Sequence, residues 1–294
     1  MDWQKAKIIF LGTPNFGVPI LFNLIKSHYN IIAVISQPDR PVGRQQIIEV
    51  TPVKKVALEN KILVEQFESL RTANAVNFIK KNEPDLLVVV AYGQIIPQTI
   101  LDIPKYGCLN IHPSLLPKYR GASPVAAAIL NGDQETGVTI IKLDDKIDHG
   151  SIVSQSVFTI LEDDNTESLE NSLACEGAEL LAKVLPDYLA DKIIAQPQDD
   201  SLATYTKILT KNDGQIDWQK TPLEIDCQIR ALYPWPGTWT THHGKNIKII
   251  RAHIEAQKLK IDLMQPAGKL PMSYKEFVNG YGQLESDKVL NNSK

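Results

Sequence analysis

Short apolar segments alternate with amphipathic segments through the first half of the chain. Four of them are rich in β-branched residues and show little polar alternation: KIIFLG (7–12), NIIAVIS (30–36), DLLVVVAYG (85–93) and GCLNIH (107–112). Such segments are typical of strands buried on both faces of a parallel sheet. Between them lie the helical patterns VPILFNLIKSH, TPVKKVALENK and LRTANAVNFIKKN, the second with Thr51 as N-cap and Pro52 at the first helical position. This alternation predicts an α/β fold with a doubly wound, mostly parallel, Rossmann-like sheet.

After about residue 190, the pattern changes from alternating strands and helices to a polar stretch followed by mostly strand-like segments. Two further strands, TGVTIIKL (136–143) and SIVSQSVFTI (151–160), precede a long helical pattern, TESLENSLACEGAELLAKVLPDYLAD. The polar residues 192–206 read as a linker, and then a helical segment around LEIDCQIRALYPWPG leads to the strand-like runs TWTTHH, NIKIIRAHI and KLKIDLM. We therefore expect a first domain at 1–191, a linker at 192–206 and a small β-rich domain at 207–294.

The charge of the chain is distributed unevenly. Its 294 residues are 43% hydrophobic with a net charge of −3, which allows a sizeable core and does not indicate a nucleic-acid binder. However, residues 204–294 carry 13 Lys and Arg against 9 Asp and Glu, whereas residues 1–203 carry 18 against 25. A basic tail on an acidic body suggests a polyanionic partner, and scatter in surface charge explains the difference equally well.

The cysteines and the N-terminal residues indicate in which cellular compartment the protein is expected. Cys108, Cys175 and Cys227 lie far apart, without a CxxC pair or an even count that would suggest disulfides. The start MDWQKAKIIFLG has no pattern of a signal peptide, and no apolar run is long enough for a membrane helix. We expect a reduced protein of the cytoplasm that does not enter the membrane.

The first candidate motif is GTPNFG, residues 12–17, at a strand-to-helix turn. It lacks the glycine spacing of a dinucleotide fingerprint and the Lys-Ser/Thr of a P-loop. A plain tight turn at the edge of the sheet is the favoured interpretation.

The second candidate is the pair Asn110 and His112, which ends a predicted strand just before Pro113. Residues two apart project from the same face of a strand, and buried polar groups without partners cost roughly 1–3 kcal/mol. Two such groups at the carboxyl end of a parallel strand, where these sheets bind ligands, favour a functional site over satisfied structural residues.

The third candidate is the turn KLDDKIDHG, residues 142–150. Clustered carboxylates with a histidine can bind a cation, although no EF-hand or HExxH spacing is present. The alternative is that one aspartate faces His112 and orients it as an acid or base.

A rival arrangement places Cys108, Asn110 and His112 on one strand face as a nucleophile constellation. Alternate residues on a flat strand are about 6–7 Å apart, too far for a Cys–His hydrogen bond across Asn110. We therefore expect Cys108 to belong to the core.

Several motifs in order resemble one family. VVVAYGQIIPQTILDIPKYGCLNIHPSLLPKYRGASPV, followed by GVTIIKLDDKIDHG, is similar to the formyltransferases that use 10-formyltetrahydrofolate. FLGTPNFGVPIL, SQPDRPVGR and IRALYPWPGTW resemble the group of these enzymes that acts on methionyl-tRNA, and QPAGKLPMSYKEFVNG resembles the family's tail. The resemblance runs almost continuously from residue 7 to 240. It implies transfer of a formyl group to the α-amine of methionyl-initiator-tRNA, giving formylmethionyl-tRNA for translation initiation.

The resemblance also implies site residues, which are carried over position by position. The catalytic residues would be Asn110, His112 and Asp148. The folate co-substrate would contact Ser114, Leu115, Leu116, Pro117, Gln94, Ile95 and Ile96, and the tRNA substrate would contact Phe16, Arg40 and Arg44. Arg120 and Gly121 would support the folate loop, unless Arg120 only forms a surface ion pair. No metal is implied, and we expect a monomer.

Three features depart from the family's pattern. The segment after Arg44 reads QQIIEVTP where the family carries lysines, which means fewer phosphate contacts. Lys146 and His149 stand where the family more often has Gly and Thr, so a position that favours positive φ bears a side chain. The tail is short for an OB-like barrel, which needs about five strands to close, and predicts a shortened β-barrel.

Two other functions remain open from the residues. One is a formyltransferase for a small amine, such as an amino sugar or a purine precursor, for which a short tail would be no handicap. The other is a folate- or RNA-binding module without catalysis, which the presence of all three candidate catalytic residues disfavours.

Overall fold

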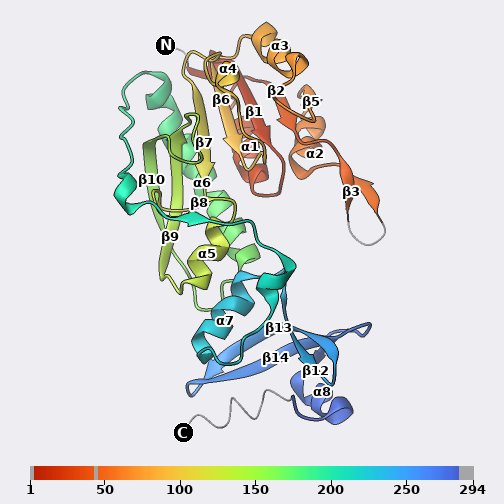
Figure 1. Cartoon of the computed structure of the whole chain (residues 1–294). Helices are drawn as coiled ribbons and strands as arrows, with labels where there is room; N and C mark the ends of the chain where they lie inside the picture. Colours follow the sequence, from red (N-terminus) through yellow and green to blue (C-terminus); the bar gives the residue numbers. More distant parts are fainter. Residues whose placement is uncertain (1–2, 43–45, 285–294) are drawn as a thin grey trace. The chain divides into compact units, whose positions relative to one another are not determined.

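The computed structural model describes residues 3–42 and 46–284. The chain divides into two compact units (Figure 1). The first unit comprises residues 1–121, 137–158 and 170–205, and the second comprises 122–136, 159–169 and 206–294. Residues 192–205, expected as a linker, thus pack with the first unit.

A seven-stranded sheet forms the centre of the first unit, in the spatial order β10-β9-β7-β6-β1-β2-β5. Its strands are β1 (Ile8–Gly12), β2 (Ile31–Ser36), β5 (Val64–Gln66), β6 (Leu86–Val90), β7 (Cys108–His112), β9 (Glu135–Lys142) and β10 (Ser151–Thr159). The pairs β5–β2, β2–β1, β1–β6 and β6–β7 are parallel, whereas β7–β9 is antiparallel. The predicted, mostly parallel sheet is confirmed, and its carboxyl edge includes the ends of β1, β2, β6 and β7.

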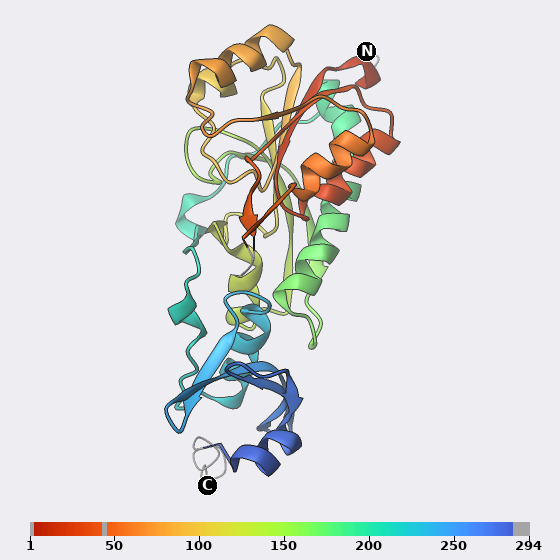
Figure 2. The ribbon, with the colours of Figure 1, turned by 90° about the vertical axis from the view of Figure 1, so that its right-hand side faces the viewer.

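Helices cover both faces of this sheet, as a doubly wound fold requires (Figure 2). On one face lie α1 (Gly17–Lys26), α2 (Pro52–Glu59) and α6 (Thr166–Leu189), and on the other α3 (Ala73–Asn82) and α4 (Gln98–Leu101). The second face has a continuous apolar core in which Leu70, Ala75 and Ile100 pack with Ile9, Leu11 and Leu87 of the strands. Thr51 caps α2 by accepting a hydrogen bond from the Lys54 N–H, with Pro52 in the first turn, as predicted.

Several short elements of the first unit were not predicted. They are the 3₁₀ turns at Trp3–Lys5 and Asp200–Leu202, the hairpin of β3 (Arg40–Val42) and β4 (Ile47–Glu49), and β8 (Arg120–Gly121), which pairs with β11 (Tyr205–Thr206). All are too short to show a hydrophobic period, which explains why the pattern along the chain did not reveal them.

The second unit contains an antiparallel sheet in the order β12-β13-β14-β15. Its elements are α5 (Pro124–Leu130), a 3₁₀ turn at Lys211–Gly214, α7 (Pro222–Ala231), β12 (Thr238–His242), β13 (Lys245–Glu255), β14 (Lys258–Pro266), β15 (Met272–Ser273) and α8 (Tyr274–Tyr281). Ile225 and Ile229 of α7 pack with Ile249, Met264 and Phe277 in its core. The predicted small β-rich domain is confirmed, and its strands are antiparallel, with four strands in this sheet among the described residues.

Over residues 3–42 and 46–284, no helix combines the length and apolar character needed to cross a membrane.

Phe277 is the aromatic centre of the second unit. It is fully buried and lies against His242 and Tyr281. We expect Phe277→Ala to lower the free energy of unfolding of this unit by about 3–5 kcal/mol, because a large side chain is removed from a packed core. Calorimetry of the full chain would measure the shift. Leu270→Ala is the control, since Leu270 is 82% exposed and should change nothing. Equal shifts for the two variants would contradict this packing.

Candidate active site

The loops at the carboxyl edge of the parallel sheet are tied to one another. The carbonyl of Tyr92, after β6, accepts hydrogen bonds from Thr13 Oγ1, after β1, and from Gln37 Nε2, after β2, both at 3.1 Å. The Thr13 hydroxyl also accepts from the backbone N–H of Gln37 at 3.4 Å. Three loops far apart in sequence are therefore fixed together at the edge where β7 ends.

His112 ends β7 and is almost completely buried, with 4% of its surface exposed. Its Nε2 lies 3.0 Å from the carbonyl oxygen of Tyr119. Because a carbonyl only accepts, Nε2 must carry a hydrogen and donate it. The other ring nitrogen, Nδ1, is then the position at which the imidazole can take up or release a proton.

Asp148 faces that second nitrogen. Its Oδ1 lies 3.7 Å from His112 Nδ1, and its Oδ2 accepts a hydrogen bond of 2.8 Å from the backbone N–H of Gly121. Asp148 has φ = 48°, in the left-handed region, which aspartate tolerates better than most residues. The structure thus brings Asp148 to His112 across 36 positions of sequence, as the resemblance implied.

Asn110 lies two residues before His112 on β7 and is half-buried. Cys108, two residues earlier again, is 1% exposed and packs in the core of the sheet. Burial raises the pKa of its thiol to about 12, so the reactive thiolate is strongly disfavoured. The expectation that Cys108 belongs to the core is confirmed.

The loop of residues 114–117 is held by hydrogen bonds with the buried side chains of Ser114 and Thr139 and with the exposed side chain of Gln155. Thr139 donates to the carbonyl of Ser114 at 2.6 Å and accepts from the N–H of Leu116 at 3.1 Å. Gln155 Nε2 donates to the Leu116 carbonyl at 2.7 Å, and the Ser114 hydroxyl donates to the Lys118 carbonyl at 2.7 Å. The polar atoms of the loop therefore point inward, while Leu115 and Pro117 stay partly exposed.

The loop after β6 contains Gln94, Ile95 and Ile96. The amide of Gln94 accepts from the N–H of Leu70 at 2.9 Å and donates to the carbonyls of Phe67 and Glu68 and to Gln37. This side chain therefore anchors the loop. Ile95 is 62% exposed, whereas Ile96 is buried in the core.

The three residues expected at the tRNA substrate differ in their surroundings. Phe16 directly precedes α1 and is buried. Arg40 lies on β3, with a side chain that is 66% exposed and an ion pair of 3.3 Å to Glu68. Arg44 lies outside the described residues.

The turn at residues 144–149 is closed by its own side chains. Asp144 accepts from the N–H of Lys146 at 3.0 Å and contacts His149 Nδ1 at 2.5 Å, while His149 Nε2 lies 3.3 Å from Asp200. Within the part of the chain that the structure describes, no group of three or more His, Cys, Asp or Glu side chains is arranged to hold a metal ion.

Two site contacts were not anticipated from the sequence. They come from the Tyr119 carbonyl and from Gln198, whose Nε2 donates to the Asp148 carbonyl at 2.8 Å. Arg120, expected either to support the folate loop or to form a surface ion pair, is 1% exposed and is not a surface residue. Gln198 lies in a polar stretch 50 residues after Asp148 and carries no local signal. Arg120 offered one, because an arginine beside a predicted loop needs a partner if it is buried.

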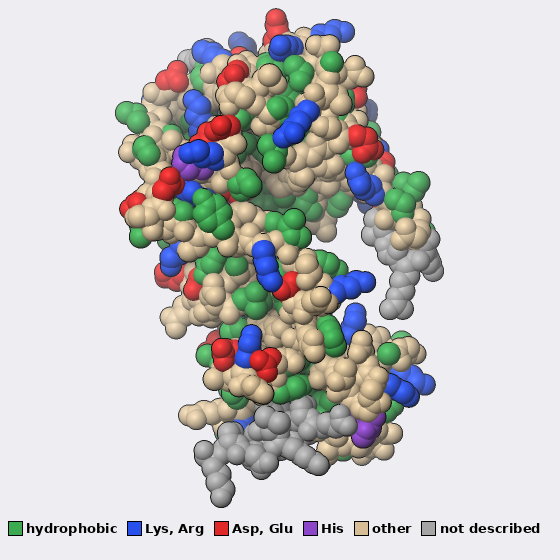
Figure 3. All heavy atoms as spheres, in the orientation of Figure 1, with side chains coloured by type: hydrophobic (Ala, Val, Ile, Leu, Met, Phe, Trp, Pro, Cys, Tyr) green, Lys and Arg blue, Asp and Glu red, His purple; other side chains and the backbone are tan. Residues whose placement is uncertain are grey.

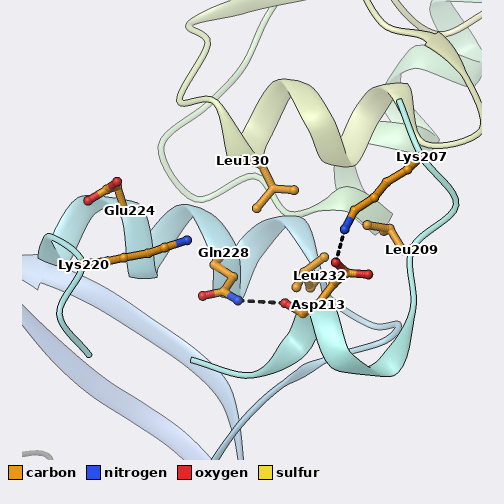
Figure 4. Close-up of a pocket in the computed structure, with 8 residues that line it drawn as sticks. All are labelled: Leu130, Lys207, Leu209, Asp213, Lys220, Glu224, Gln228 and Leu232. Atoms are coloured by element: carbon orange, nitrogen blue, oxygen red, sulfur yellow. Dashed lines mark hydrogen bonds and ion pairs between the residues drawn. The ribbon is translucent and has the colours of Figure 1, made fainter. Parts of the chain in front are cut away.

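The second unit has a hollow of about 260 Å³ of its own (Figure 4). Leu130, Leu209 and Leu232 line it together with charged residues, among them Lys207, whose ammonium pairs with Asp213. Hydrogen bonds from Lys207 and Thr210 lower the pKa of Asp213 to about 2. None of the residues expected at the site lines this hollow.

Because Cys108 is buried, we expect its thiol to react more slowly than an exposed thiol. In the native protein at about pH 8, iodoacetamide should label Cys175, which is exposed, and spare Cys108 and Cys227, which are buried. Peptide mass spectrometry would identify the labelled residue, and Cys175→Ser should abolish the labelling. Labelling of Cys108 as fast as Cys175 would reopen the nucleophile interpretation.

Comparison with known proteins bears directly on this arrangement. The formyl transferase family matches residues 6–185, and the family's C-terminal domain matches residues 208–260. The methionyl-tRNA formyltransferase of Enterococcus faecalis is 42% identical to this chain, with 97% of this chain and 99% of that protein covered. The methionyl-tRNA formyltransferase of Listeria monocytogenes is 44% identical, with 95% and 96% covered.

Solved structures share the fold. An N-formyltransferase from Helicobacter canadensis, in complex with folinic acid and dTDP-3-aminofucose, matches with a TM-score of 0.66 at 22% identity, covering 91% of this chain and 98% of that one. A 4-N formyltransferase from Francisella tularensis matches with a TM-score of 0.67 at 22% identity, covering 85% and 98%. The chain therefore belongs to the formyl transferase family, in the group of the methionyl-tRNA formyltransferases.

Proposed function

We propose that this protein transfers the formyl group of 10-formyltetrahydrofolate to the α-amine of methionyl-initiator-tRNA, giving formylmethionyl-tRNA. The observation that carries the proposal is the pair of buried His112 and half-buried Asp148 beside Asn110, at the carboxyl edge of the sheet. It occurs in a chain that is 42% and 44% identical to methionyl-tRNA formyltransferases over nearly its whole length.

The three side chains divide the chemistry between them. When bound, the folate supplies a formyl group on a nitrogen that must regain a proton as it leaves. Asn110 donates a hydrogen bond to the formyl oxygen as that oxygen becomes negative. His112 takes the proton of the attacking amine at Nδ1, because Nε2 already donates to Tyr119, and passes it to the leaving nitrogen. Asp148 stabilises the imidazolium between these two transfers.

The folate co-substrate suits the two loops that follow the neighbouring strands β6 and β7. Their polar side chains, Gln94 and Ser114, are engaged within the protein, while Ile95 and Leu115 keep apolar surface exposed or partly exposed. Apolar walls with a few backbone polar groups are what a flat heterocycle requires. We therefore assign the pterin to residues 94–96 and the loop at residues 114–117.

The tRNA is assigned to Phe16, Arg40 and Arg44 of the first domain and to the basic domain at 207–294. The described part of the β3–β4 hairpin bears hydrophobic side chains (Figure 3), including Ile47 at 54% and Ile48 at 69% exposure. A hairpin of this composition makes fewer phosphate contacts than a lysine-rich one. We expect its contribution to tRNA binding to depend less on salt. We further expect the protein to act in the cytoplasm as a monomer.

The direct test combines the protein with 10-formyltetrahydrofolate and methionyl-tRNA, free methionine or a sugar-nucleotide amine. Formyl transfer to methionyl-tRNA is expected. His112→Asn should lower kcat by at least about 100-fold, and Asn110→Ala by about 10² to 10³, with folate binding retained. His28→Asn is the matched control, because His28 is an exposed histidine before β2 whose φ of 59° asparagine tolerates.

The outcomes separate the candidate functions. Transfer to the sugar amine alone would replace the proposal with a small-amine formyltransferase. Folate or tRNA binding without any transfer would indicate a binding module, and His112→Asn would then change nothing.

Arg40 gives a second test, directed at the tRNA. Arg40→Ala should raise the KM for methionyl-tRNA several-fold and leave the KM for folate unchanged. It should also lower the salt slope, the steepness with which the logarithm of the tRNA binding constant falls with the logarithm of the salt concentration, by roughly one. Lys81→Ala, in the last turn of α3, removes an exposed cation at the opposite edge of the sheet and serves as the control. A salt slope identical in the two variants would remove Arg40 from the tRNA site.

A further inference from the structure

Residues 196–205 run back along the first unit after α6, and we call this segment the strap. Gln196 forms a two-way backbone bridge with Ile152, at 2.7 and 2.8 Å, and Thr204 donates its backbone N–H to the Pro117 carbonyl at 3.3 Å. The strap therefore begins beside the strand that follows the Asp148 turn and ends beside the loop that follows His112. All of it belongs to the first unit.

Gln198 of the strap forms hydrogen bonds to the turn that carries Asp148. Its Nε2 donates to the carbonyl of Asp148 and to the carbonyl of Gly150, both at 2.8 Å. Its Oε1 accepts from Nε and Nη2 of Arg120, at 3.1 and 2.8 Å. Because the guanidinium only donates and the two carbonyls only accept, the amide has a single satisfactory orientation. Both of its N–H bonds are then directed at the turn.

Arg120 is the fixed end of this arrangement. It is 1% exposed, and its guanidinium also binds Asp200 at 2.8 Å and the Tyr205 hydroxyl at 3.1 Å. Burial alone would lower the pKa of Arg120, but the hydrogen bonds to Asp200 and Tyr205 raise it above its ordinary value. The buried cation thus stays charged and holds three strap residues against β8.

Thr204 acts on the other side of the imidazole. Its Oγ1 accepts the backbone N–H of Tyr119 at 2.8 Å, and its carbonyl accepts the N–H of Arg120 at 2.9 Å. Tyr119 in turn offers the carbonyl to which His112 Nε2 donates. Thr204 is exposed, so water can partly replace its hydroxyl, and its effect should be smaller than that of Gln198.

Tyr119 and Asp148, the two residues that contact the ring nitrogens of His112, both have positive φ, at 62° and 48°. This conformation is unfavourable for a residue other than glycine, so surrounding contacts must hold it. The strap provides such contacts to both residues. We propose that the strap positions the catalytic pair, with Gln198 as the positioning residue for Asp148 and Thr204 for the Tyr119–His112 bond.

This inference rests on the proposed function for the identity of the catalytic pair. Positioning of acid–base groups affects the chemical step, and a displacement of about 1 Å can cost as much as 10²-fold in rate. Gln198 contacts the turn through backbone carbonyls and not through any group assigned to substrate. Its loss should therefore lower kcat and leave both KM values in place.

Two substitutions of Gln198 separate positioning from packing. Gln198→Ala removes the amide, whereas Gln198→Glu keeps its size and its contact with Arg120 but loses both N–H donors. Both should lower kcat by about tenfold or more with KM unchanged, and a loss in Gln198→Glu as large as in Gln198→Ala would exclude lost packing as its cause. The control is Gln196→Ala in the same strap, because the exposed Gln196 amide donates to the carbonyl of Ile194, two residues away. Wild-type kcat in Gln198→Glu would overturn the inference.

A double-mutant cycle tests whether Gln198 works through Asp148. In the background of Asp148→Asn, which already lacks the carboxylate, Gln198→Ala should lower the remaining rate by less than about twofold. Full additivity of the two losses would show that Gln198 acts elsewhere. On the other side, Thr204→Val should lower kcat by a few fold, and Thr204→Ser should restore it.

A readout independent of activity keeps this inference apart from the proposed function. In nuclear magnetic resonance spectra of the full chain, the Nε2–H proton of His112, identified by its loss in His112→Asn, should exchange slowly with solvent. Gln198→Glu and Thr204→Val should accelerate that exchange, and Gln196→Ala should not. Unchanged exchange in both strap variants would overturn the inference. Absence of formyl transfer by the wild-type protein, with the exchange pattern as expected, would overturn only the proposed function.

Discussion

The organisation of the site depends on one imidazole held between a carbonyl and a carboxylate. The Tyr119 carbonyl fixes the hydrogen on Nε2 of His112, so proton exchange takes place at Nδ1, in front of Asp148. Since the ring is almost completely buried, neither contact is replaced easily by water. The surrounding loops must then hold one backbone carbonyl at Nε2 and one carboxylate at Nδ1.

The parallel sheet brings several loops to one edge, where they can position these two groups. The loops after β1, β2 and β6 meet at the Tyr92 carbonyl, and Thr139 with Gln155 fixes the loop after β7 from below. Polar side chains in these loops bind protein backbone and hold the loops in place. The surfaces left to a ligand are apolar, which supports the assignment of a flat co-substrate to these loops.

The sequence predicted the features that depend on residues close together along the chain. The two-residue period of a strand places Asn110 and His112 on one face. Thr51 and Pro52 predicted the start of α2. Cys108 lies in the core, as expected. Contacts that join distant segments had no such signal, and Gln198 lies in a stretch that looks like any polar linker.

The turn that departs from the family's pattern shows how a substitution can be accommodated. A side chain at Lys146, where the family more often has glycine, suggested strain, yet the left-handed residue of this turn is Asp148 and not Lys146. Asp144 closes the first part of the turn by accepting the Lys146 N–H, and His149 joins Asp144 to Asp200. Asp200 is also the partner of buried Arg120. His149 therefore links the turn that carries Asp148 to the strap a second time, beside Gln198.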